Sequence, residues 1–130
     1  SEVPFVGALT SVLIPDLPPT VTEWEEWGDP LHDAEVYRCM KSYTPYENVR
    51  AGAYPSILAT TSLNDTRVEV TEPAKWVAHL RRTVADDPSR PILLRTELVA
   101  GHGGVSGRYQ AWRDVAFELA WIIDQVAPEA

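Results

Sequence analysis

The sequence is poor in cysteine, in basic residues and in long apolar runs, and each shortage excludes a class of protein. Cys39 is the one cysteine, which excludes an internal disulfide and a cysteine-based zinc site. Lys and Arg number 11 against 19 Asp and Glu, and the net charge of −8 argues against nucleic-acid binding. No apolar run approaches the roughly 20 residues that a membrane-spanning helix needs. We expect no membrane or nucleic-acid partner, and a cytoplasmic location.

The composition is otherwise that of a packed domain. Hydrophobic residues make up 45% of the 130 residues and charged residues 23%, so a core is expected and disorder is not. The length suits one domain or part of one. Cys39 falls in a helical pattern, which predicts a buried, unreactive thiol.

Apolar periodicity predicts an α/β fold. Short apolar, β-branched runs predict strands at 56–62 and at 92–99. Helical spacing predicts helices at 6–14, 34–42, 73–84 and 107–126, with Thr71 or Glu72 capping the third. In the last helix the apolar positions recur every three or four residues and predict a core-facing seam: Tyr109, Trp112, Ala116, Leu119, Ile123 and Val126.

This pattern predicts the end of a larger parallel α/β sheet. Two strands make a poor free-standing sheet, and nearly continuous apolar strands need neighbours on both sides. The apolar opening, with Val3, Phe5 and Val6, also resembles a cut through the middle of a fold. We therefore expect residues 1–130 to be the C-terminal part of one catalytic domain.

An acid and a histidine each follow a predicted strand. Asp65 lies in the turn after the first strand, and His102 lies in the glycine-rich Gly101–Gly104 after the second. The carboxyl ends of parallel strands share one edge, where ligands bind. The separation of 102 − 65 = 37 residues leaves room for a crossover helix. The pair therefore predicts a proton-shuttling imidazole oriented by a carboxylate, although each residue alone could serve only its turn.

The nucleophile that would complete such a site has no counterpart in the sequence. Acid before histidine is the order of the last two triad members in α/β-hydrolases, whose serine lies upstream on a G-x-S-x-G elbow. Ser106 follows His102 and is rejected. The glycines lack the GK[ST] of a phosphate loop, and His32 and His79 lie too far away for a metal site, so no cofactor or metal is expected.

The acidic segment 23–30 allows two interpretations. Three carboxylates, Glu23, Glu25 and Glu26, stand beside Trp24 and Trp27. The segment could be a solvated helical turn anchored by its indoles, which composition alone favours. It could also be a pocket wall in which a carboxylate pairs with a cation and an aromatic ring covers its stem.

Several segments together resemble the C-terminal end of the prolyl oligopeptidase family of serine peptidases, in the subfamily that cleaves after basic residues. The segments follow one another along nearly the whole chain: Val3-Pro-Phe-Val, Glu23-Trp-Glu-Glu-Trp-Gly-Asp-Pro, Ser42-Tyr-Thr-Pro-Tyr-Glu-Asn-Val, Thr60-Thr-Ser-Leu-Asn-Asp-Thr-Arg-Val, Glu72-Pro-Ala-Lys-Trp-Val and Ala100-Gly-His-Gly-Gly. The resemblance implies an α/β-hydrolase catalytic domain, an upstream β-propeller, and short peptides as substrates, cut after Arg or Lys.

The resemblance also implies residue roles. Asp65 and His102 match the triad aspartate and histidine. Glu23 matches the acid that pairs with the basic side chain of the substrate, and Arg67 matches a position placed to meet substrate carbonyl or carboxylate groups. The serine and the propeller are missing, so we expect the upstream part of the same peptidase as partner and no activity from this chain alone.

Two other functions remain open. The chain could be a non-catalytic fragment or interaction module that docks on a larger partner through a bare sheet edge and its N-terminal segment. It could also belong to another α/β-hydrolase, such as an esterase. The acidic segment at Glu23 argues against the esterase, whose pocket has no use for a carboxylate there.

Overall fold

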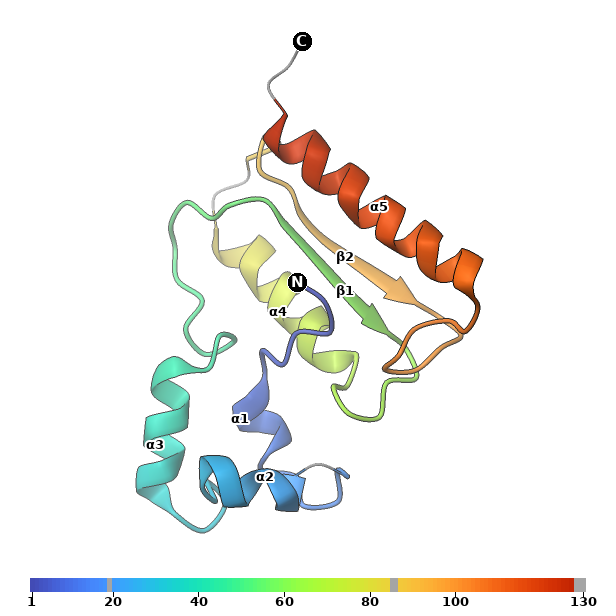
Figure 1. Cartoon of the computed structure of the whole chain (residues 1–130). Coiled ribbons are helices and arrows are strands. Elements are labelled where there is room, and N and C mark those ends of the chain that lie inside the picture. The colour runs from blue at the N-terminus through green and yellow to red at the C-terminus, as the bar shows by residue number, and fades with distance from the viewer. Residues whose placement is uncertain (19, 85–86, 128–130) are drawn as a thin grey trace.

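The computed structural model describes residues 1–18, 20–84 and 87–127 (Figure 1). Its elements are, in order, α1 (Ala8–Ser11), α2 (Thr20–Trp27), α3 (Ala34–Tyr43), β1 (Ile57–Ser62), α4 (Thr71–Thr83), β2 (Ile92–Glu97) and α5 (Arg108–Val126). The predicted α/β order is confirmed, and the acidic segment adds the helix α2.

The two strands form a parallel sheet joined by the crossover helix α4. Their register pairs Ile57 with Ile92 and continues to Ser62 with Glu97, so both strands end level at one edge. In Figure 1, α4 covers one face of the sheet and α5 runs along the other. This arrangement carries the chain after β1 and the chain after β2 to the same place, as the spacing of Asp65 and His102 predicted.

The N-terminal segment extends the sheet on the free side of β1. Val3 N–H donates to Thr60 O at 2.9 Å, and Thr60 N–H donates to Ser1 O at 2.9 Å. Glu2 thereby forms an isolated parallel bridge with Thr60.

A small apolar core lies between α1 and α3. Leu9, Val12 and Met40 are each at most 3% exposed, and Phe5 and Trp24 pack partly buried against them. Asp33 caps α3 by accepting hydrogen bonds from Glu35 N–H and Val36 N–H in the first turn. The buried position in this part of α3 belongs to Met40, and Cys39 faces solvent. The prediction of a buried thiol is therefore wrong.

The first helix is shorter than the predicted span of 6–14. Only Ala8–Ser11 is helical, because Val6 O accepts a hydrogen bond from Tyr46 N–H at 2.9 Å instead of from the N–H four residues further along a helix. Turns follow up to Ile14, and Pro15 then has no N–H to extend a helix.

The apolar seam predicted for α5 faces away from the sheet, so the prediction that it contacts the core of this chain is wrong. Trp112 is 58% exposed, Ile123 is 61% exposed, and none of the described residues of α5 is buried. The side turned to the sheet carries polar residues, and Asp114 pairs there with Arg95 of β2. The same side also carries Trp121, which lines a small pocket together with Leu58 of β1.

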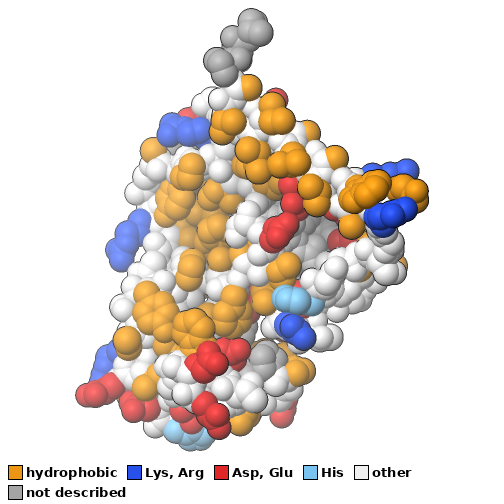
Figure 2. Space-filling model, viewed as in Figure 1, with side chains coloured by type: hydrophobic (Ala, Val, Ile, Leu, Met, Phe, Trp, Pro, Cys, Tyr) orange, Lys and Arg blue, Asp and Glu red, His pale blue; other side chains and the backbone are white. Residues whose placement is uncertain are grey.

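Hydrophobic side chains cover much of the molecular face in Figure 2, along α5 and across the middle of the molecule. Leu119 and Val126 of α5 are 54% and 74% exposed, and Leu93 of β2 is 38% exposed. Within the described ranges, no helix has the length and apolar character needed to cross a membrane.

Candidate active site

Asp65 lies buried in the turn that follows β1. Its Oδ1 accepts hydrogen bonds from Arg67 N–H at 2.8 Å and from Val68 N–H at 3.0 Å, which hold the carboxylate in one orientation. Burial raises the pKa of Asp65, but the N–H groups of Val68 and Arg67 and the neighbouring His102 outweigh burial, so its pKa lies below the ordinary value. The turn therefore holds a fixed negative charge.

The ring of His102 lies directly against this carboxylate. His102 Nδ1 is 2.9 Å from Asp65 Oδ2, and the side chain of Asp65 is 0% exposed while that of His102 is 39% exposed. Among the residues described, Asp65 is the one hydrogen-bonding partner of the ring. A carboxylate at Nδ1 favours the tautomer with its proton there, and it leaves Nε2 as a proton acceptor at the open side.

Three contacts join the loops that carry the pair. Leu63 N–H donates to Glu97 O at 2.7 Å, which extends the sheet ladder past the end of β1. Asn64 Nδ2 donates to Val99 O at 3.0 Å. A Cβ at Gly101 would lie 3.1 Å from Asn64 O, so glycine permits this close approach of the two loops.

Asn64 and Glu97 are positioning residues that the sequence did not reveal. The side-chain amide of Asn64 donates a hydrogen bond to Val99 O, in the loop that leads to the histidine. The carboxylate of Glu97 accepts hydrogen bonds from the N–H groups of Val99 and Ala100 and shapes the start of that loop. Their position was the available signal in the sequence, because Asn64 directly precedes Asp65 and Glu97 is the last residue of β2.

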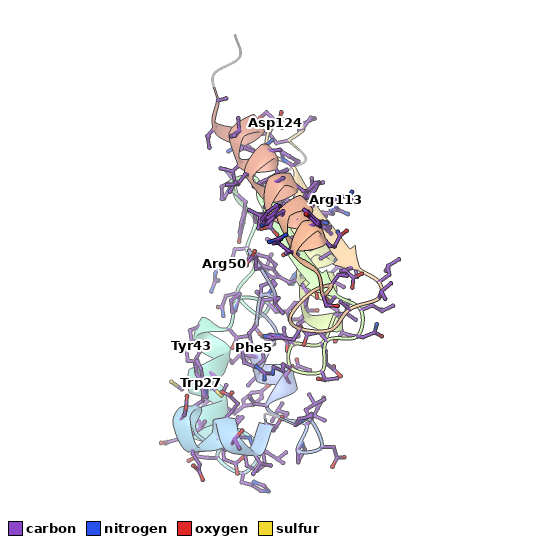
Figure 3. All side chains as sticks on the ribbon, turned by 45° about the vertical axis from the view of Figure 1, so that its right-hand side comes forward. Phe5, Trp27, Tyr43, Arg50, Arg113 and Asp124 are labelled. Carbon is purple, nitrogen blue, oxygen red and sulfur yellow. The ribbon has the colours of Figure 1, made fainter. Side chains whose placement is uncertain are left out.

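Glu23 and Arg67 line the same pocket. This pocket has a volume of about 490 Å³, and its other walls are Phe5, Pro18, Trp27 and Val68. Glu23 is half-buried and accepts a hydrogen bond from Trp27 Nε1, whereas Glu25 and Glu26 are exposed. Phe5 and Trp27 both lie in the lower part of Figure 3, near the short helices.

A second pocket opens beside His102. It measures about 280 Å³ and lies between the sheet and α5. Charged and hydroxyl side chains line it together with apolar ones, and its walls are formed by the following residues: Glu2, Val3, Thr60, Thr61, Ser62, Arg95, Glu97, Ala111, Asp114 and Glu118, with Gly103, Gly104 and Val105 beside the histidine. The exposed side of the His102 ring therefore borders this pocket.

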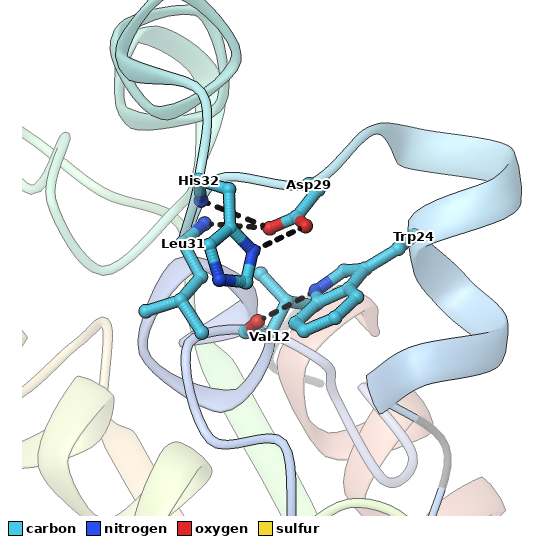
Figure 4. A network of polar contacts seen from close by, with 5 residues as sticks. All are labelled: Val12, Trp24, Asp29, Leu31 and His32. Atoms are coloured by element: carbon cyan, nitrogen blue, oxygen red, sulfur yellow. Dashed lines mark hydrogen bonds and ion pairs between the residues drawn. The ribbon is translucent and has the colours of Figure 1, made fainter.

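The other histidines have separate environments. His32 Nδ1 lies 2.7 Å from Asp29 Oδ2 in the turn between α2 and α3 (Figure 4). The ring of His79 packs 5.2 Å from that of Tyr46, centroid to centroid, and His79 is half-buried. Tyr46, in the turn that follows α3, therefore partly covers His79 of α4.

A parallel sheet with an acid after one strand and a histidine after the next defines an α/β-hydrolase type of site. The family model of the prolyl oligopeptidase family matches residues 1–129, and the chain therefore belongs to that family. Protease 2 of Moraxella lacunata is 45% identical over 128 residues, which are 98% of this chain and 18% of that protein. Dipeptidyl aminopeptidase BI of Pseudoxanthomonas mexicana is 41% identical over 95% of this chain and 17% of its own length.

Solved structures agree with the sequence relatives. Oligopeptidase B from Leishmania major superposes with a TM-score of 0.89 at 40% identity, over 95% of this chain and 17% of that one. Oligopeptidase B from Trypanosoma brucei, with covalently bound antipain, gives 0.91 at 37% identity, over 99% and 18%. The expected α/β-hydrolase fold and the similarity to the subfamily of oligopeptidase B are confirmed. The chain spans less than a fifth of the length of these relatives.

Proposed function

We propose that this chain supplies the aspartate and the histidine of a Ser-His-Asp triad in a serine oligopeptidase that cleaves short peptides after Arg or Lys. The observation that carries the proposal is the 2.9 Å contact between the buried Asp65 carboxylate and His102 Nδ1 at the carboxyl edge of the sheet. The similarity to protease 2 and to oligopeptidase B supports it.

The geometry of the pair suits a proton shuttle. His102 Nε2 takes the proton of a serine hydroxyl as its oxygen attacks the scissile carbonyl, and then gives that proton to the leaving amine. Asp65 stays ionised and stabilises the imidazolium that forms. Its low pKa, held by the N–H groups of Arg67 and Val68 against burial, suits this role.

The pocket of Glu23 and Arg67 suits a basic side chain followed by a polar backbone. Glu23 offers a carboxylate to a guanidinium or ammonium group, and the Trp27 indole beside it can cover the aliphatic stem. Arg67 lies two residues after Asp65, so its guanidinium can meet carbonyl or carboxylate groups of a substrate held near the triad.

The serine and the remaining strands are assigned to an upstream part of the same peptidase. The relatives are more than five times longer than the stretch they share with this chain. The exposed apolar seam of α5 and the outer edge of β2, which pairs with no other strand among the described residues, suit burial against such a part. The same surfaces would fit the non-catalytic alternative, but that alternative does not account for the Asp65–His102 contact.

The histidine can be tested in the peptidase assembled from this chain and its upstream part. His102→Ala removes the proton shuttle, and we expect kcat on an arginyl substrate to fall by roughly 10⁴-fold or more. His32→Ala is the matched control, because His32 pairs with Asp29 outside the site and should leave kcat unchanged. A His102→Ala enzyme that works near the wild-type rate would refute the assignment.

The pocket carboxylate can be tested through substrate choice. Glu23→Gln keeps the shape and removes the charge, so kcat/KM for arginyl and lysyl substrates should fall by about a hundredfold or more. A neutral substrate should lose little. Glu26→Gln, an exposed change three residues further along α2, serves as the control. Equal loss on both kinds of substrate would mean that Glu23 does not recognise the charge.

A further inference from the structure

A buried acid outside the proposed triad and the proposed substrate pocket joins two layers of the molecule. Glu72, in the first turn of α4, is 2% exposed. Its Oε2 accepts a hydrogen bond from Gly7 N–H at 2.8 Å, and its Oε1 accepts one from the Ser11 hydroxyl. The sequence predicted a helix-capping role for Glu72, but its carboxylate instead bonds to α1, more than 60 residues earlier in the chain.

The packing around this carboxylate is close. A Cβ on Gly7 would lie 3.2 Å from Glu72 Cγ, so a larger residue at position 7 would press on the acid. Burial raises the pKa of Glu72, while the bonds from Ser11 and Gly7 oppose that rise. Both carboxylate oxygens are thus used, and the contact fixes where α1 lies on α4.

From α1 the contacts continue to the helix that carries Glu23. Ser11 O accepts a hydrogen bond from Thr20 Oγ1 at 3.1 Å. Trp24 Nε1 donates to Val12 O at 2.9 Å (Figure 4). Thr20 and Trp24 lie on either side of Glu23 in α2, so both ends of that turn are held by α1.

On its other side, Glu72 is close in the sequence to Asp65 of the proposed triad. Glu72 of α4 follows Asp65 by 72 − 65 = 7 residues, and Arg67 lies between them in the connection from β1 to α4. The pocket of about 490 Å³ is bounded on one side by Glu23 and Trp27 of α2 and on the other by Arg67 and Val68 of this connection. Through these contacts Glu72 links α2, on one side of the pocket, to the β1–α4 connection on the other side.

We propose that Glu72 is a positioning residue for specificity. By holding α1, and through it α2, it sets where Glu23 lies relative to Asp65 and His102. A basic side chain paired with Glu23 then places its scissile bond at the triad. Glu72 does not touch the substrate, and its effect requires Glu23. This inference rests on the proposed function of the pocket.

The experiment compares an arginyl with a matched neutral substrate in the assembled peptidase. Glu72→Ala removes both acceptors, and the ratio of kcat/KM values, arginyl over neutral, should fall by about tenfold, mainly through KM, because small displacements of a positioning group are costly. Glu72→Gln keeps an oxygen for Gly7 N–H and should restore most of the ratio. Glu69→Ala, the control, removes a nearby carboxylate whose hydrogen-bonding partner, among the described residues, is the Thr71 hydroxyl, and it should leave the ratio unchanged.

A double-mutant cycle separates positioning from simple stability. If Glu72 acts through Glu23, then Glu72→Ala should leave the substrate ratio unchanged in a Glu23→Gln background. An equal loss on both substrates in the wild-type background, or an undiminished change of the ratio without the Glu23 charge, would overturn the inference.

A milder variant covers the case in which Glu72→Ala does not fold. Ser11→Ala removes one donor and leaves the Gly7 bond, and it should lower the substrate ratio in the same direction by a few fold. An unchanged ratio in Ser11→Ala would then overturn the inference. A wild-type enzyme with no preference for the arginyl substrate would instead refute the proposed function itself.

Discussion

When a carboxylate lies beside Nδ1 of an imidazole, Nε2 is the ring nitrogen that remains free to accept or donate a proton. In this chain the carboxylate of Asp65 is fully buried while the ring of His102 is partly open, which fits the proposed roles of an orienting acid and a proton-exchanging histidine. The sequence predicted the same roles, and the exposures of the two side chains agree with that prediction. The sequence predicted the pair itself because each residue follows a strand of a βαβ unit.

Asp65→Asn tests the orienting role. The amide can accept the N–H bonds of Arg67 and Val68, but it cannot hold the same imidazole tautomer, and kcat should fall by roughly 10⁴-fold near neutral pH. In the wild type, the pKa of Asp65 lies below its ordinary value, so the carboxylate stays charged above that value and gains a proton only in stronger acid. As the pH is lowered from about 7 to about 5, protonation of Asp65 should therefore contribute nothing to any loss of kcat/KM, and the slope of that loss should not exceed one proton. A two-proton slope would mean that Asp65 also titrates in that range.

Glu72 shows what a local pattern cannot predict. A glutamate before a proline at the start of a helix is a common N-terminal signature, and the sequence was interpreted in that way. The carboxylate instead accepts hydrogen bonds from Gly7 and Ser11. A partner 61 to 65 residues away leaves no mark in the spacing, and the same holds for Asn64 with the histidine loop.

At the scale of elements, α5 shows that an apolar period predicts a helix but does not predict which side of that helix faces the sheet. The pattern predicted the helix and its apolar seam correctly, but it could not say against what the seam packs. In this chain Arg95 of β2 pairs with Asp114, so the polar side of α5 faces the sheet. The Arg95 guanidinium also lies 4.4 Å from the Phe117 ring centroid. The seam is left outside, where only further polypeptide could bury it.

A pair of identical replacements can test whether the seam is covered in the assembled peptidase. Leu119→Gln places an amide on the seam, and if that position is buried it should cost about 2 kcal/mol of stability. Arg113→Gln changes an exposed residue on the flank of the same helix (Figure 3) and should cost almost nothing. The measurement is the urea concentration at which half of the activity is lost. Equal midpoints for the two variants would show that the seam stays exposed.

At the scale of the whole molecule, the sequence predicted the class of fold better than the site. Strand and helix periods were enough for the α/β order, and the motifs around Asp65 and His102 indicated the family. The pocket that unites Glu23 with Arg67 depends on how α1 and α2 dock on the β1–α4 connection. That docking is made by buried single contacts, and no periodic pattern encodes it.

The absence of a serine elbow gives the last prediction, which concerns the chain on its own. Incubated with a fluorogenic arginyl substrate and with a serine-directed phosphonate, the isolated chain should neither hydrolyse the first nor react with the second. His102 lacks a hydroxyl partner among the described residues, and Ser106 lies on the exposed loop before α5. Adding the upstream part should restore both activities, and His102→Ala should abolish them again. Labelling of the isolated chain that disappears in Ser106→Ala would show that the chain carries its own nucleophile, and the proposed division of the triad would then be wrong.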